Sequence, residues 1–117
     1  MKTILFAVYD AKAETFSAPY TIPKVELALR AFGEMVQDEE TDIGKYPEDY
    51  QLLMLGEYDT DSGMIEPERM PVVVINALEL KNKLREAFAA RQRQLDNIPT
   101  PEDTYATIAE GKSNGPA

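Results

Sequence analysis

Apolar positions follow two different periods along this chain, and each period predicts an element. Residues 3–9 carry apolar side chains on both faces, which is typical of a central strand covered on both sides. Residues 51–58 show a second strand with the same mixed pattern, and 72–75 form a last short apolar run. The sequence therefore predicts three apolar strands, two of them near the middle of a sheet.

Turn residues separate these runs. Residues 10–13 favour a turn, followed by a returning strand over 14–18 that Pro19 limits to an edge. Residues 47–49 open the second strand with turn residues, and residues 59–63 predict the tight bend of a hairpin. After that bend, Pro67 and Pro71 are expected to break the strand.

Two stretches have helical spacing. The first begins near Pro23, with Thr21 or nearby backbone as its cap, and carries one apolar stripe. The stripe consists of Val25, Ala28, Leu29, Phe32 and Met35 with Val36. The second helix is predicted over 77–96, with Asn76 as cap and Glu79 three positions on. Its apolar face consists of Leu80, Leu84, Ala87, Phe88 and Leu95, and Arg91 falls in the middle of it.

The order of these elements predicts an α+β fold. We expect a small, mainly antiparallel sheet of four to five strands, with two helices packed on one face. Residues 1–96 are expected to form a single domain. Residues 97–117, rich in Pro and small polar residues, are expected to form a flexible C-terminal tail in which 105–108 dock weakly.

Charge restricts the partners. The 117 residues include 12 basic and 21 acidic side chains, giving a net charge of −9. Residues 1–76 hold the whole excess, with six Lys or Arg against fifteen Asp or Glu, whereas 77–96 hold five against three. Because nucleic-acid affinity comes largely from Lys and Arg displacing counterions, DNA binding must be local and sensitive to salt. The simpler interpretation is that the acidity maintains solubility.

The residues that are missing exclude most catalytic chemistry. Without His or Cys there is no usual zinc site, no Ser–His pair and no thiolate nucleophile, and no cofactor or metal site is expected. Asp59, Asp61 and Gly63 resemble the start of a calcium loop, but a hairpin turn explains them better. No apolar run reaches the ~20 residues that a membrane span needs. We expect a protein without enzyme activity and without membrane attachment.

Aromatic and basic side chains supply the candidate sites. Tyr9, Lys12, Phe16 and Tyr20 lie at or beside the first predicted hairpin, where aromatic rings beside a Lys can stack bases, although a role in the sheet core explains them too. Lys81 and Arg85 are the basic pair on the second helix. The candidate oligomer interface lies further along that helix and consists of Leu84, Phe88, Arg91 and Leu95.

Three segments together resemble one family. They are FAVYDAKAETFSAP (6–19), ALRAF (28–32), and Asp38 followed by PEDYQLLMLGEYDTDSGMI (47–65). In this order they are similar to the small non-structural protein of gokushovirus-like Microviridae, bacteriophages with circular single-stranded DNA. The resemblance covers about residues 4–66 and implies a non-enzymatic viral protein of the host cytoplasm, linked to single-stranded DNA synthesis or packaging.

Three hypotheses follow. The first is an accessory factor of viral DNA replication or packaging that binds single-stranded DNA as an oligomer. The second is an acidic protein-interaction module, a homodimer that contacts a phage replication or capsid protein or a host protein without binding DNA. The third is an acidic DNA mimic, supported by charge alone.

Overall fold

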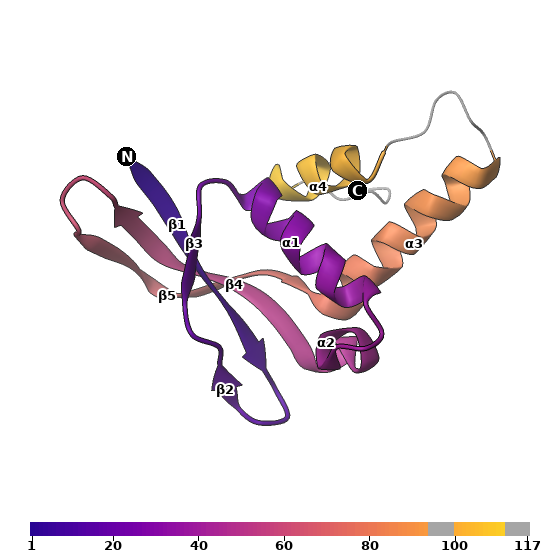
Figure 1. Ribbon diagram of the computed structural model, residues 1–117, viewed down its shortest axis with the longest axis horizontal. Coiled ribbons are helices and arrows are strands. Elements are labelled where there is room, and N and C mark those ends of the chain that lie inside the picture. The colour runs from indigo at the N-terminus through magenta and orange to yellow at the C-terminus, as the bar shows by residue number, and fades with distance from the viewer. Residues whose placement is uncertain (94–99, 112–117) are drawn as a thin grey trace.

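The structure is a computed structural model and describes residues 1–93 and 100–111. It consists of a five-stranded sheet with helices gathered on one side of it (Figure 1). The strands are β1 (Lys2–Asp10), β2 (Thr15–Phe16), β3 (Tyr20–Ile22), β4 (Tyr50–Asp59) and β5 (Ile65–Asn76). The helices are α1 (Val25–Gln37), α2 (Asp42–Lys45), the 3₁₀ turn η1 (Pro47–Asp49), α3 (Ala77–Arg93) and α4 (Pro101–Ala109). The predicted α+β class is confirmed.

All pairs in the sheet are antiparallel, and β1 lies at its centre. The order is β2-β1-β4-β5, and β3 pairs with the same edge of β1 as β2. The predicted central strand over 3–9 is therefore confirmed. The predicted returning strand over 14–18 is shorter than expected, because only Thr15 and Phe16 pair before β3 takes over the edge after Pro19.

Strand β5 differs from the sequence prediction. Pro67 and Pro71 were expected to break it, yet one strand runs from Ile65 to Asn76. β5 tolerates both prolines because it lies at the edge of the sheet, and because its regular pairing with β4 is interrupted between Pro67 and Val72. The same interruption protects the exposed edge against pairing with other chains.

The core lies between the sheet and α1. Phe6 and Leu52 from the sheet and Phe32 from α1 are fully buried, and Leu80 and Leu84 of α3 complete the same cluster. The predicted stripe on the first helix is confirmed, since Ala28, Leu29, Phe32 and Val36 are all buried. Helix α1 begins at Val25 after Lys24, so the predicted cap at Thr21 is wrong, because Thr21 belongs to β3.

More helices are present than the sequence predicts. Asn76 caps α3 as expected, accepting a hydrogen bond from the Leu78 N–H at 2.8 Å. Helix α4 was not expected, because its residues were assigned to the tail. Thr100 and Asp103 form a reciprocal capping box at its start, and Tyr105 joins the core. The predicted domain boundary at 96 lies in the stretch 94–99, outside the described residues.

Candidate binding surfaces

One face of the sheet carries no charge at its register positions. Residues directly opposite in antiparallel strands share a face. The register places the following residues together, and we call them the outer face: Thr3, Leu5, Ala7 and Tyr9 of β1; Gln51, Leu53, Gly56 and Tyr58 of β4; Ile65, Pro67, Val73 and Asn76 of β5; Phe16 of β2; and Thr21 of β3. In a chain of net charge −9, none of these paired positions is a carboxylate. The charged residues Glu68 and Arg69 of β5 have no partner in the register and are not assigned to this face.

The outer face lies opposite the helices. Ala7 and Leu53 are buried, yet they stand apart from the continuous core cluster that packs against α1 and α3. Ile65, Val73 and Phe16 remain about half exposed. The face is therefore a largely apolar surface that no helix of the described residues covers.

Two of the predicted DNA-binding residues meet on this face. Tyr9 and Phe16 are cross-strand partners, and their ring centroids lie 4.8 Å apart. Lys12 is exposed in the adjoining turn, which Asp10 fixes by accepting hydrogen bonds from the Lys12 and Ala13 N–H groups. The structure thus places an aromatic pair next to a turn that carries Lys12 together with the carboxylates of Asp10 and Glu14.

The other predicted DNA-binding residues lie elsewhere. Tyr20 is the partner of Phe6, with ring centroids 6.3 Å apart, so it faces the helices, and burial raises the pKa of its phenol. Lys81 donates a hydrogen bond to the Gly44 carbonyl at 3.0 Å, and Arg85 is exposed on α3. The six predicted residues therefore do not form one surface.

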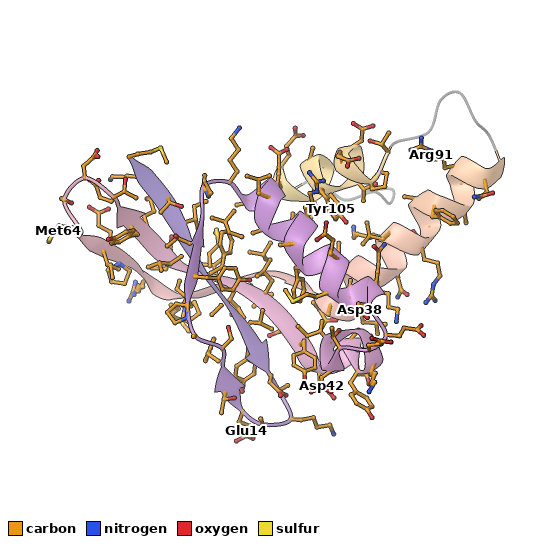
Figure 2. The ribbon with its side chains drawn as sticks, in the orientation of Figure 1. Glu14, Asp38, Asp42, Met64, Arg91 and Tyr105 are labelled. Atoms are coloured by element: carbon orange, nitrogen blue, oxygen red, sulfur yellow. The ribbon has the colours of Figure 1, made fainter. Side chains whose placement is uncertain are left out.

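The predicted oligomer interface is also divided. Leu84 is buried in the core, whereas Phe88 is 63% exposed and Arg91 lies near the far end of α3 (Figure 2). Leu95 lies outside the described residues. Helix α3 leaves the core between Leu84 and Phe88, although the sequence predicts both residues on one apolar face.

Sequence reasoning missed most of the outer face. Leu53, Tyr58, Ile65 and Val73 were not among the candidates. The sequence of β4 did indicate a second apolar face, because Leu53 and Leu55 alternate with Leu52 and Met54 and so point to the other side of a regular strand. The positions of Ile65 and Val73 were hidden, because the irregular register of β5 cannot be read from its sequence.

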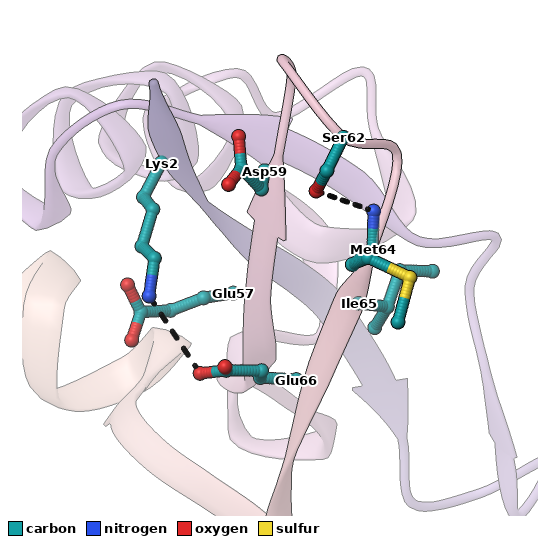
Figure 3. A pocket seen from close by; sticks show the side chains of 7 residues that line it. All are labelled: Lys2, Glu57, Asp59, Ser62, Met64, Ile65 and Glu66. Carbon is teal, nitrogen blue, oxygen red and sulfur yellow. Dashed lines mark hydrogen bonds and ion pairs between the residues drawn. The ribbon is translucent and has the colours of Figure 1, made fainter.

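A small cavity of about 250 Å³ opens at the far end of the β4–β5 hairpin (Figure 3). Lys2, Glu57, Asp59 and Glu66 line it with Ser62, Met64 and Ile65. Lys2 Nζ lies 3.8 Å from Glu66, and both side chains are mostly exposed. This cavity holds an exposed ion pair of little energetic weight.

The acids of the β4–β5 turn have structural partners. Asp59 accepts a hydrogen bond from the Asp61 N–H at 2.9 Å, and both carboxylates pair with the N-terminal ammonium of Met1. The backbone hydrogen bond from Asp61 is the main cause that lowers the pKa of Asp59. Within residues 1–93 and 100–111, no group of three acidic side chains is placed to hold a metal ion.

The fold and these surfaces describe a small α+β protein whose most distinctive surface is an uncharged sheet face. The chain belongs to the phage ORF5 protein family, whose model matches residues 3–80. It is similar to Protein ORF5 of Chlamydia phage 1, with 31% identity over 84 residues, covering 68% of this chain and 88% of the relative. No solved structure matches the chain. The resemblance to a microvirus protein is thus confirmed at the level of the family.

No helix in the described part of the chain is long and apolar enough to cross a bilayer.

Proposed function

We propose that this ORF5 family protein is a non-enzymatic accessory factor of viral single-stranded DNA replication or packaging in the host cytoplasm. In this proposal it binds single-stranded DNA weakly, as an oligomer, through the outer face. The observation that supports it is the sheet face whose paired positions include no carboxylate and carry the Tyr9–Phe16 pair, next to the turn that holds Lys12. The proposal includes no catalytic role, because the chain contains neither His nor Cys.

The outer face removes the main objection to DNA binding by an acidic protein. Repulsion between a carboxylate and a phosphate is screened within a Debye length of about 8 Å at physiological salt. A strand lying on a face without carboxylates therefore meets less repulsion than the net charge suggests. Exposed aromatic rings on a sheet stack bases in other folds, at about 1–3 kcal/mol per base. One Lys beside them gives weak affinity and a shallow salt dependence.

We expect a fluorescein-labelled oligothymidylate to bind with a Kd of about 10–100 µM at about 50 mM salt, measured by fluorescence anisotropy. Phe16→Ala should weaken binding about tenfold through the loss of one stacking ring, and Lys12→Ala should flatten the salt dependence by about 0.7 in its logarithmic slope. Phe88→Ala removes a ring that is 63% exposed, against 49% for Phe16, and that lies away from the outer face, so it should leave the affinity unchanged. Equal losses for Phe16→Ala and Phe88→Ala would contradict the proposal, as would no binding at about 100 µM protein.

A second candidate is self-association through the same face without DNA. The observation that favours it is the aliphatic part of the outer face, where Ile65 and Val73 are about half exposed and no charge opposes contact with a second copy. An uncharged face that meets its own copy across a two-fold axis buries apolar area on both sides.

Neighbouring valines on β5 test this candidate. Val73 pairs with Leu53 on the outer face, whereas Val72 pairs with Met54 on the opposite face, and both are at least 41% exposed. We expect light scattering to give a dimer mass at about 100 µM, because weak interfaces associate in that range. Val73→Lys should reduce this mass to that of the monomer, and Val72→Lys should not. A wild-type monomer, or dimers that survive Val73→Lys, would contradict self-association through this face.

A further inference from the structure

A groove of about 460 Å³ lies on the helix side of the molecule and reaches the outer face at one residue, Phe16. The end of β1, the β2 region, α1, α2 and the start of β4 enclose it. Its lining is Val8, Asp10, Thr15, Phe16, Ser17, Ala18, Tyr20, Met35, Ile43 and Tyr50. None of these residues is Lys or Arg.

The groove is mainly apolar, and its frame is held by several independent contacts. Ser17 fixes the β2 side, since its hydroxyl accepts a hydrogen bond from the Val8 N–H at 2.9 Å. The Ala11 N–H donates to the Asp49 carbonyl at 2.8 Å, which holds the first turn against η1. On the α2 side, the Thr41 hydroxyl accepts from the Gly44 N–H at 3.0 Å. The walls are thus preformed, as in most ligand-binding clefts.

Asp10 lines the same end of this groove as Tyr50, and Asp42 and Asp49 are the sequence neighbours of the lining residues Ile43 and Tyr50. Burial raises the pKa of the Tyr50 phenol, and the negative charges of Asp10, Asp42 and Asp49 raise it further. Figure 2 shows Asp42 on α2, close to Asp38. Among the ion pairs of the described residues, none involves Asp10, Asp42 or Asp49. Asp10 is the charged side chain in the lining, whereas Asp42, Asp49, Lys12 and Lys45 lie outside it.

We infer that this groove binds a short peptide segment of a partner protein, with a large apolar side chain inside the groove and a Lys or Arg beside it, near Tyr50. The volume suits one or two large side chains. The carboxylate of Asp10 in the lining, which forms no ion pair within the described residues, complements the positive charge, and the charges of Asp42 and Asp49 act on the same phenol of Tyr50. The aromatic rings add cation–π attraction. The inference is independent of DNA binding by the outer face.

Other occupants fit the charges less well. Phosphates would meet the carboxylate of Asp10 and no lining cation, which opposes nucleic acid. A neutral apolar molecule would fill the volume but leave the carboxylates without a partner. Both remain outcomes of the test below.

The test uses three labelled nine-residue peptides and the full chain. The first alternates Leu and Arg, the second replaces Arg by Glu, and the third replaces Leu by Ser. We expect fluorescence anisotropy to show binding of the Leu/Arg peptide at least about tenfold tighter than either of the others. Amide chemical shifts in NMR spectra should move at Ile43 and Tyr50 and not at Val73.

Two double variants with the same change in net charge locate the site. Asp42→Asn with Asp49→Asn should weaken the Leu/Arg peptide about fivefold, because two charge contacts are lost. Glu39→Gln with Glu40→Gln, on exposed positions that do not line the groove, should leave the affinity within twofold. Because Asp42 and Asp49 lie at the ends of short helical turns, circular dichroism should first show that the variant is folded.

The inference is overturned by any of four results: equal losses in the two double variants, equal binding of the Leu/Glu peptide, shifts confined to the outer face, or groove shifts produced by oligothymidylate instead. Phe16 is common to both surfaces, so the separation rests on the Asp42→Asn, Asp49→Asn double variant, which leaves the outer face unchanged, and on the two different ligands. Failure of the peptide test leaves the oligothymidylate titration unaffected, and the reverse also holds. The two proposals are therefore separable.

Discussion

Gly56→Ala is expected to destabilise the protein by about 4 kcal/mol and to lower Tm by about 15 °C. Gly56 lies on β4 between Leu5 of β1 and Pro67 of β5. A Cβ at this position would approach the Glu66 carbonyl oxygen and would lie 2.8 Å from the Pro67 Cα. Both obstacles are backbone atoms, so the sheet itself must shift. The φ of +156° adds a conformation that side chains rarely adopt.

Gly63→Ala is the matched control. Gly63 also has a positive φ, of +75°, but nothing lies within 4 Å of its missing Cβ. We expect a loss of about 1 kcal/mol from backbone strain alone. Urea unfolding followed by circular dichroism measures both variants. Similar losses at the two positions would show that the contact between Gly56 and β5 has no energetic weight.

Tyr105→Ala is expected to cost about 3 kcal/mol, because it removes a buried ring that joins α4 to α1. Tyr105 is 6% exposed and belongs to the core cluster. Its ring lies over Gly33 of α1, where a Cβ would be 2.5 Å from the Tyr105 hydroxyl and 3.0 Å from Cε1. Burial is the main cause that raises the pKa of this phenol, with Glu34 and Glu102 adding to it. Hydrogen exchange should show that the amides of α4 lose protection in this variant.

A double-mutant cycle with Gly33 tests the contact directly. Gly33→Ala alone should destabilise by about 2 kcal/mol, because Tyr105 must move. In the Tyr105→Ala background the same change should stabilise by about 1 kcal/mol, since Ala favours a helix interior over Gly. Phe88→Ala, an exposed ring on α3, should change stability by less than about 0.5 kcal/mol. Additive effects of Gly33 and Tyr105 would contradict the packing of α4 on α1.

The fold class could be predicted because its elements carry local signals. The stripe from Ala28 to Val36 defines one buried helix face, and 59–63 define the hairpin that joins β4 to β5. Strand β3 and helix α4 were missed for opposite reasons. Tyr20–Ile22 is too short to show a period, and the capping residues Thr100 and Asp103 lie among prolines that suggested a tail.

The candidate sites could be predicted from the sequence only in part. Tyr9 and Phe16 were chosen as aromatic neighbours of a turn, and the structure places their rings together. Their companion Tyr20 faces the other way, because β3 pairs with β1 in a register that sets Tyr20 opposite Phe6. Since side chains alternate between the two faces of a strand, a register shift of one residue would move an aromatic ring from one face of the sheet to the other.

The sequence by itself determined the family, the α+β class, the main helix and hairpin, and the absence of His and Cys, because these depend on residue identity and local spacing. Only the tertiary structure decided that the uncharged paired positions of β1, β4 and β5 share one face, and that Asp10 and Tyr50 line one groove with residues of α1 and α2. Both arrangements depend on strand pairing and bulges between residues far apart in the chain. Strand register and close backbone packing, as at Gly56, arise from contacts that no local pattern encodes.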